Sequence, residues 1–187
     1  MVQVLRLKEL TQQFIVEEIK AGKIFIYPTD TLYGIGCDAT NIKAVRNIRK
    51  IKRRSKKPFS VIAPSKKWIT SNFKLKATFL KKLPGPFTYI LKPKNKQLLP
   101  KAVLKGAKMI GVRIPKHKFT TFIQKSGKPF VTTSVNISGQ QHIFQVIDIP
   151  KEILEKVDYV IDDGVLANPA STILDFSQEP PSIIKRQ

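Results

Sequence analysis

Hydroxyl, amide and cationic side chains gather in four short segments of the chain. Residues 28–34 follow an apolar run and place two hydroxyls and a carboxylate on a turn, and residues 52–57 carry five cations in six positions. Residues 132–139 hold four hydroxyls and an amide, and Ser171 and Thr172 begin a late apolar run. Such groups bind phosphate oxygens and carboxylates. Each segment also has a purely structural interpretation, since Asp and Thr favour turns and charge runs usually face solvent.

The charge balance points to anionic partners. The chain has 34 basic and 13 acidic residues, a net charge of +21, and residues 39–147 hold 21 Lys and 5 Arg but no Asp or Glu. A domain with this balance attracts polyanions such as nucleic acid, nucleotide phosphates or pyrophosphate. An AT-rich genome, which favours Lys codons over Arg codons, is an alternative explanation for the excess of Lys over Arg. It accounts less readily for the absence of Asp and Glu from residues 39–147.

Several common motifs fail on inspection. Residues 34–39 match the dinucleotide pattern G-x-G-x-x-A, but no acidic residue follows about 20 positions later to bind a ribose, which excludes NAD. Ser126, Gly127 and Lys128 are followed by Pro129, so there is no phosphate-binding P-loop. His117 and His142 have no clustered partners, which argues against a zinc site.

Length and composition favour one domain in a reducing compartment. The 187 residues, 42% of them apolar, are expected to form a single domain over residues 1–187. No apolar run is long enough to cross a bilayer, so no membrane association is expected. Cys37 is the sole cysteine and is expected to be a small buried residue. Because one cysteine cannot form an internal disulfide, we predict a cytoplasmic protein.

Hydrophobic periodicity and turn residues indicate the elements that must position these segments. Asn41 is expected to cap a helix that carries Ile42, Val45, Ile48 and Ile51. Other helices are expected at 7–21, 66–72, 78–83, 120–125 and 148–157. Strands are expected at 23–27, 59–63, 87–91, 109–114, 130–133, 159–162, 172–176 and 183–186. Strands interleaved with helices predict an α/β or α+β sheet domain.

Six motifs, taken in order, resemble those of the YrdC family, also called TsaC. P-T-[DE]-T-x-Y-G appears at 28–34, K-x-R at 52–54, P-G-P-x-T at 84–88, V-R-x-P-x-H at 112–117, T-x-S-A-N-x-S-G at 132–139 and S-T-x-x-D at 171–175. The resemblance covers essentially the whole chain, and the family's terminal arginine matches Arg186. The length resembles the short single-domain form of the family.

The resemblance implies a threonylcarbamoyl-AMP synthase, which is a nucleotidyltransferase. Such an enzyme condenses L-threonine, bicarbonate (or CO2) and ATP to L-threonylcarbamoyl-AMP and pyrophosphate. The product would serve a separate transferase complex that makes threonylcarbamoyladenosine in tRNAs reading ANN codons. The implied fold is a YrdC-like single domain, an α/β (α+β) structure in which helices flank a twisted mixed sheet with a basic concave face.

The same resemblance assigns roles to residues. Lys52 and Arg54 would stabilise charge during catalysis and bind ATP together with Arg113, Ser134, Asn136 and Arg186. Threonine would be held by Thr29, Thr31, Thr132 and Ser171, with Thr29 also shaping the turn. Magnesium is expected on the ATP phosphates and not in a protein metal site, with Asp30 as the one carboxylate that could contribute.

The chain also departs from the family pattern. Ile62 stands where longer relatives have a histidine, so the threonine carboxylate needs another partner, and Val135 replaces the usual alanine. No residue stands out as the base for the threonine amine. Two alternatives from other classes stay open. One is a non-catalytic protein that binds tRNA or double-stranded RNA, or assists ribosome assembly, through the basic face. The other is a carbamoyl-transfer domain, since the same fold occurs in hydrogenase-maturation carbamoyltransferases.

Overall fold

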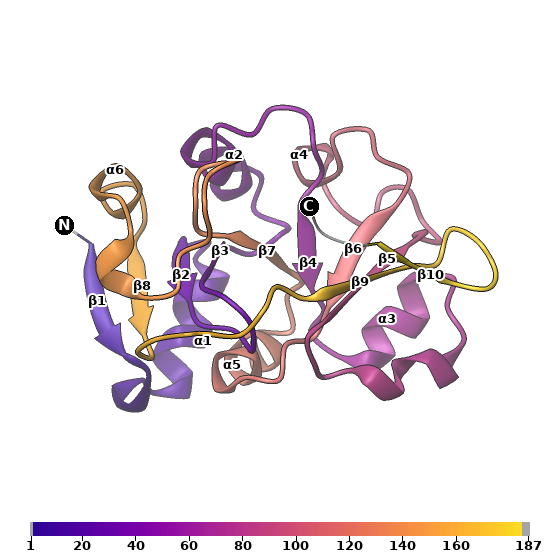
Figure 1. Ribbon diagram of the computed structural model, residues 1–187, viewed down its shortest axis with the longest axis horizontal. Coiled ribbons are helices and arrows are strands. Elements are labelled where there is room, and N and C mark those ends of the chain that lie inside the picture. Colours follow the sequence, from indigo (N-terminus) through magenta and orange to yellow (C-terminus); the bar gives the residue numbers. More distant parts are fainter. Residues whose placement is uncertain (1, 185–187) are drawn as a thin grey trace.

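A ten-stranded mixed sheet forms the centre of the computed structural model, which describes residues 2–184 (Figure 1). The strand order is β1-β8-β2-β3-β7-β4-β6-β5-β9-β10. The strands are β1 (Gln3–Arg6), β2 (Phe25–Tyr27), β3 (Gly34–Gly36), β4 (Ser60–Ile62), β5 (Phe87–Leu91), β6 (Ile110–Arg113), β7 (Phe130–Ser134), β8 (Tyr159–Asp162), β9 (Thr172–Asp175) and β10 (Ser182–Ile184). The α-helices are α1 (Gln12–Lys20), α2 (Ile42–Ile51), α3 (Lys66–Asn72), α4 (Lys101–Leu104), α5 (Lys118–Ser126) and α6 (Lys151–Leu154). Short 3-10 helices are η1 (Leu7–Glu9), η2 (Ala77–Lys82) and η3 (Val146–Asp148). The predicted mixed α/β architecture is confirmed.

Strand register brings the polar segments together. β2 and β3 pair antiparallel with Tyr27 opposite Gly34, and Gly34 lies opposite Ser134 of β7. The turn at 28–33 and the segment after Ser134 therefore lie at the same end of these central strands. Ser60, the first residue of β4, lies opposite Thr132 of β7. The cationic run that precedes β4 therefore reaches the same end of the strands.

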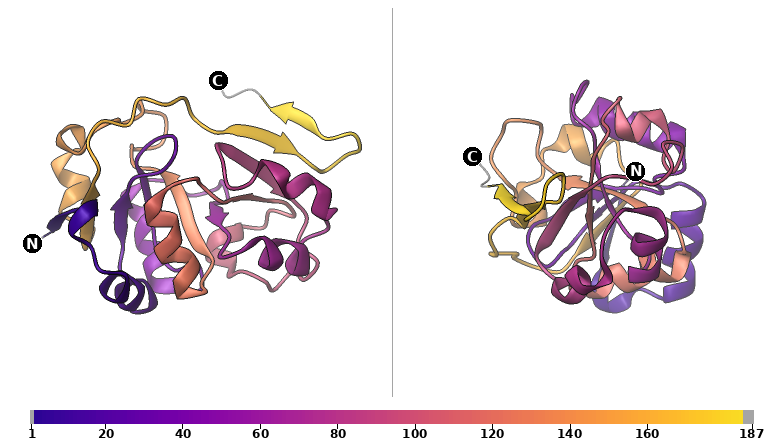
Figure 2. Two further views of the ribbon diagram at one scale, coloured as in Figure 1. Left: turned by 90° about the horizontal axis from the view of Figure 1, so that it is seen from below. Right: turned by 90° about the vertical axis from the view of Figure 1, so that its right-hand side faces the viewer.

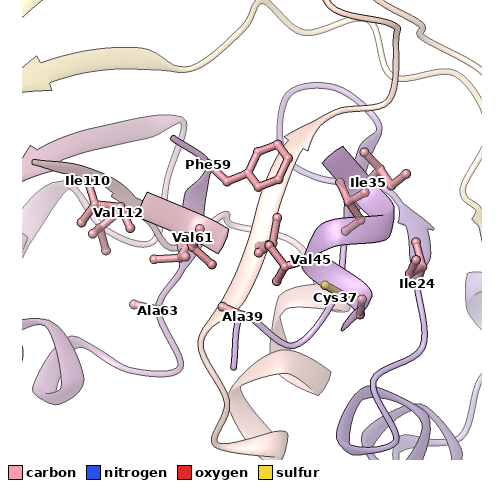
Figure 3. Packing of buried hydrophobic residues seen from close by; sticks show 14 of the residues in the cluster. Ile24, Ile35, Cys37, Ala39, Val45, Phe59, Val61, Ala63, Ile110 and Val112 are labelled. Atoms are coloured by element: carbon pink, nitrogen blue, oxygen red, sulfur yellow. The ribbon is translucent and has the colours of Figure 1, made fainter. Parts of the chain in front are cut away.

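Two hydrophobic clusters cover the two faces of the sheet. Alternate strand residues divide between them, as β4 shows: Val61 packs with α2 and α4, while Ile62 packs with α1 and α5. The first cluster is the larger and includes Val45 and Phe59 (Figure 3). The alternation follows from the two-residue period of a strand. Of the apolar positions predicted for α2, Val45, Ile48 and Ile51 are buried against the sheet, while Ile42 is exposed.

Local signals account for most element boundaries. The Asn41 side chain accepts a hydrogen bond from the Ala44 N–H at 3.0 Å, which confirms the predicted cap of α2. The predicted bounds of α3, β5 and β8 agree with the structure. Gly22 follows α1 with a φ of +80°, as expected for a residue that ends a helix in the left-handed region.

Other predictions need correction. The helix expected at 7–21 is divided into η1 and α1, because Thr11 caps α1 by accepting from the Phe14 N–H at 3.4 Å. The helix expected at 78–83 is 3-10, and the one expected at 148–157 reduces to the four residues of α6. β1, β3 and α4 were not predicted. β3 contains two glycines in three residues, and at Gly36 an added Cβ would lie 2.0 Å from the Val131 carbonyl oxygen. Neighbouring strands, not β propensity, therefore stabilise β3.

The single cysteine lies in the hydrophobic core. Cys37 is fully buried as predicted, and burial raises the pKa of its thiol, so the group stays protonated. Among residues 2–184, no helix is long and apolar enough to cross a membrane.

Candidate functional site

A cavity of about 260 Å³ lies on the sheet where the four polar segments meet. The segment between β8 and β9, which crosses the sheet in Figures 1 and 2, contributes Ala170 and Ser171. Seven of the residues predicted to bind ligands line the cavity: Thr29, Thr31, Arg54, Arg113, Thr132, Ser134 and Ser171. Lys52 and Asn136 are not among its lining residues, and Arg186 lies outside the described residues.

The turn at residues 28–34 is organised by Thr29. Its hydroxyl accepts from the N–H groups of Thr31 and Leu32 at 3.1 and 3.2 Å and donates to the Leu32 carbonyl at 2.7 Å. The Thr31 hydroxyl lies 3.0 Å from that of Thr29. Thr29 therefore shapes the turn, while the Thr31 hydroxyl accepts from Arg113 Nη2 at 3.4 Å, and both residues line the cavity.

Arg113 and Asp30 form a buried ion pair at the cavity wall. Arg113 Nη2 lies 2.6 Å from Asp30 Oδ1, and the two side chains are only 9% and 10% exposed. Asp30 Oδ2 accepts from the Lys116 N–H at 2.8 Å, so both carboxylate oxygens are engaged. Burial lowers the pKa of the Arg113 guanidinium, and Asp30 opposes this by raising it. Asp30 thus serves Arg113 and has little capacity left for a magnesium ion.

Arg54 brings a second guanidinium to the cavity. Its Nη2 donates to the Pro58 carbonyl at 2.5 Å and its Nη1 to the Thr133 hydroxyl at 3.3 Å. The Arg54 and Arg113 Nε atoms are buried and have no hydrogen-bond partner within residues 2–184. Both arginines also line the cavity, so their positive charge suits an anionic ligand bound there.

Arg49 was not singled out from the sequence, yet it supports the loop that carries Arg54. It is buried, and its guanidinium donates to the carbonyls of Arg54 and Lys57 at 3.1 Å each and to that of Ala102 at 2.5 Å. Its place on the buried stripe of α2, next to Ile48, is the signal that could have identified it.

Lys52 is buried and clamps the segment after β7. Only 2% of the residue is exposed, and its ammonium donates to the backbone carbonyls of Ser134, at 2.5 Å, and Asn136. Desolvation by burial, with a smaller effect from the Arg54 charge, lowers the pKa of Lys52 to about 7. The phosphate contact expected of Lys52 stays a prediction, because its nitrogen here is directed at carbonyl oxygens.

Ser134 and Asn136 form a short polar pair. The Ser134 hydroxyl donates to Asn136 Oδ1, and Asn136 Nδ2 donates to the Gln140 carbonyl at 2.5 Å. Val135 between them is fully buried in the larger hydrophobic cluster, so its extra bulk points away from the cavity.

Hydroxyl pairs also reach the cavity from neighbouring strands. The Thr88 and Ser171 hydroxyls lie 2.8 Å apart, and the Tyr27 hydroxyl donates to Thr132 at 2.7 Å. Thr88 belongs to the P-G-P-x-T motif but was not assigned a role, and Ser60 lines the cavity without belonging to any quoted motif. The cavity thus combines two guanidiniums with several hydroxyls, and none of its lining residues in the described part of the chain is a carboxylate.

A family model named Sua5/YciO/YrdC and described as telomere recombination matches residues 17–187. The chain belongs to this family. Over 157 residues, or 81% of its length, it is 45% identical to the putative threonylcarbamoyl-AMP synthase of Methanocaldococcus jannaschii, of which it covers 73%. It is 29% identical over 175 residues to the threonylcarbamoyl-AMP synthase of Pyrococcus abyssi, and spans about half of that protein (51%).

Solved structures of the Sua5/YciO/YrdC family share the fold. The structure of P. abyssi Sua5 complexed with L-threonine matches with a TM-score of 0.85 at 26% identity, covering 99% of this chain and 57% of that one. Escherichia coli YciO matches with a TM-score of 0.85 at 23% identity, covering 100% of this chain and 96% of that one. The YrdC-like fold predicted from the motifs is therefore confirmed.

Ile62 and His117 are not among the residues that line the cavity. Ile62 is buried in the cluster formed with α1 and α5 and does not line the cavity. His117 accepts from the Phe119 N–H at the start of α5, and its Nε2 lies 3.0 Å from Asp163 Oδ2. Within residues 2–184, no group of three or more His, Cys, Asp or Glu residues could hold a metal ion.

Proposed function

We propose that this chain is a threonylcarbamoyl-AMP synthase. It would condense L-threonine, bicarbonate and ATP to threonylcarbamoyl-AMP, with release of pyrophosphate and water. The observation that carries the proposal is the cavity lined by two arginines and several hydroxyl side chains, with no carboxylate among its lining residues within 2–184. Transfer of an adenylyl group is catalysed mainly by positioning and by stabilising negative charge, which these donors can supply.

The substrates divide between two parts of the site in this proposal. ATP lies toward Arg54, Ser134 and Asn136, where Lys52 holds the loop after β7. Threonine lies toward the Thr31, Thr132 and Ser171 hydroxyls. Magnesium would be bound by the ATP phosphates and water, since Asp30 is engaged by Arg113 and Lys116. A separate transferase complex would then use the product to modify tRNA.

Substrate dependence tests this function. Pyrophosphate release from ATP is expected to require both threonine and bicarbonate, measured with magnesium in a coupled phosphate assay and by mass spectrometry of the adenylate. Serine is expected to be 10–200-fold poorer in kcat/KM, about 1–3 kcal/mol, because it lacks the methyl group. Equal turnover without threonine would contradict the proposal, and dependence on carbamoyl phosphate would favour a carbamoyl-transfer domain.

A second proposed property is sequence-independent RNA binding. Of the 21 lysines between residues 39 and 147, Lys52 is buried and Lys128 half-buried, and the other 19 are exposed with no acidic residue in that range. Exposed cations bind nucleic-acid phosphates by releasing counterions.

Binding of tRNA or double-stranded RNA is therefore expected at low salt and should weaken steeply as salt rises. The expected log–log slope is about −0.9 for each phosphate neutralised on a duplex, measured by fluorescence anisotropy. Ser134→Ala and Asn136→Ala should leave this binding unchanged while adenylate synthesis falls. Salt-insensitive, sequence-selective binding that these two variants abolish would contradict this property and would place an RNA site in the cavity.

A further inference from the structure

Residues 163–170 form an extended segment that crosses the sheet beside the cavity, and we call it the strap (Figure 2). It joins β8 to β9, and the strands β2, β3, β7, β4, β6 and β5 lie between these two in the sheet. From Val165 onward it contains no turn or helix, and six of its eight residues are exposed. Its end brings Ala170, and then Ser171, to the cavity.

The start of the strap is held by two side chains. The Tyr33 hydroxyl accepts from the Asp163 N–H at 2.9 Å and donates to the Gly164 carbonyl at 2.8 Å. His117 Nδ1 accepts from the Phe119 N–H, so the proton of the neutral ring is on Nε2, which donates to Asp163 Oδ2 at 3.0 Å. Tyr33 is fully buried and the His117 side chain is 13% exposed, so water competes little for these bonds.

The chain is also held just beyond the end of the strap. The Ser171 and Thr88 hydroxyls lie 2.8 Å apart, and both residues are buried. The Thr172 N–H donates to the Pro86 carbonyl at 2.9 Å. The strap is therefore fixed to the sheet on both sides of the cavity.

The middle of the strap is held by one exposed contact. Asn168 Nδ2 donates to the Asp30 carbonyl at 3.2 Å, and the backbone of residues 167–170 makes no hydrogen bond within residues 2–184. One exposed hydrogen bond between neutral groups contributes little free energy. Segments with exposed, unpaired backbone and few buried contacts are the ones that open most readily. The middle of the strap can therefore lift while both ends stay fixed.

Asp30 connects the strap to the charged wall of the cavity. Its carboxylate pairs with Arg113 and accepts from the Lys116 N–H, while its carbonyl accepts from Asn168. The Asn168 contact thus closes the strap onto the residue that orients a cavity guanidinium.

We propose that the strap is a gate over the bound substrates, which Asn168 latches to the Asp30 carbonyl. This inference rests on the proposed function, because the gate would retain the adenylate made in that reaction. The adenylate is an anhydride that water can hydrolyse, and closing a site excludes water from such an intermediate. Asn168 is a positioning residue that acts through the strap.

Hydrogen exchange of the wild type, followed by mass spectrometry, tests the gate. The ligands are threonine, bicarbonate, magnesium and α,β-methylene-ATP, in which adenylyl transfer is blocked. With these at ten times their Kd, exchange of residues 165–170 is expected to slow about 10-fold. The exposed residues 11–13, at the start of α1, should exchange at an unchanged rate.

Asn168→Ala tests the latch. It is expected to release α,β-methylene-ATP about 2–10-fold faster, because one neutral hydrogen bond is lost from the closed state, while the association rate stays within twofold. Both rates are measured by surface plasmon resonance with threonine and bicarbonate in the buffer. Asn168→Leu keeps the volume of the side chain without its donor and should release the analogue as fast as Asn168→Ala. Asn47→Ala, at an exposed asparagine on α2, is the matched control and should behave as wild type.

The outcomes separate the gate from the proposed function. A wild type that releases pyrophosphate in a threonine-dependent reaction, but whose residues 165–170 exchange equally with and without ligands, would overturn the gate alone. A wild-type release rate in Asn168→Leu would do the same, because shape and not the donor would then hold the strap. Absence of threonine-dependent pyrophosphate release in the wild type would overturn the proposed function and the gate together.

Discussion

Replacing Arg54 with alanine is expected to lower the rate of threonylcarbamoyl-AMP formation at least 100-fold. The Arg54 guanidinium is held by the Pro58 carbonyl and the Thr133 hydroxyl, and the residue lines the cavity. A donor that is already oriented stabilises charge developing on the transferred phosphate at no cost of reorganisation, and losing one typically costs about 100–1,000-fold. The measurement is the single-turnover rate of adenylate formation at saturating ATP and threonine.

Arg46→Ala is the matched control for this prediction. Arg46 lies on α2 and is exposed. Like Arg54→Ala, the Arg46→Ala variant removes one positive charge, but it removes it from the exposed surface. It should change the rate less than twofold. Similar losses in both variants would show that the general positive field, and not a local contact, drives the reaction.

Lys52→Ala is also expected to lower adenylate formation at least 100-fold, and to raise the KM for ATP. The ammonium of Lys52 holds the Ser134 and Asn136 carbonyls, so its removal releases the segment that presents both side chains. Two buried carbonyls would also lose their donor, which costs about 1–3 kcal/mol each. Lys50→Ala, an exposed position at the end of α2, should behave as wild type. An unchanged KM for ATP in Lys52→Ala would contradict the loop-holding role.

The lowered pKa of Lys52 gives the wild type a distinct dependence of stability on pH. The pKa of Lys52 is about 7 in the folded state and 10.5 in the unfolded state. At pH values between these two, the unfolded chain therefore binds more protons than the folded one. The free energy of unfolding contributed by this group therefore rises with pH in this window and is lost as the pH falls through 7. Urea unfolding at pH 7 and 9 should show the wild type gaining up to about 2–3 kcal/mol relative to Lys52→Met. No relative gain would mean that Lys52 stays fully charged.

Much of the site was predictable because its residues sit in short motifs. The turn at 28–34, the K-x-R pair, the segment after β7 and Ser171 were each identified from local residue chemistry. Seven of the ten proposed ligands then line one cavity, which local patterns alone could not have placed. Helix boundaries that depend on a nearby cap, such as Asn41 for α2, were predicted for the same local reason.

Elements without a local signal were missed. β3 reads Gly-Ile-Gly and has no strand propensity, and it forms because β2 and β7 pair with it on either side. Arg49 looks like one more surface cation of a basic helix, yet the packing of α2 against Phe59 and α4 buries it, and its guanidinium lies 4.4 Å from the centre of the Phe59 ring.

The amino-acid sequence by itself determined the family of this protein. Its motifs, its acid-free basic centre and its strand and helix periodicities are properties of neighbouring residues, and the motifs identify the family and the candidate residues of the site. The tertiary structure alone decided how those side chains are directed. Lys52 binds the carbonyls 82 and 84 residues away, Arg113 pairs with Asp30, and Ser60 rests over Gly111. Each of these contacts depends on the register between strands distant in the chain, which no local pattern encodes.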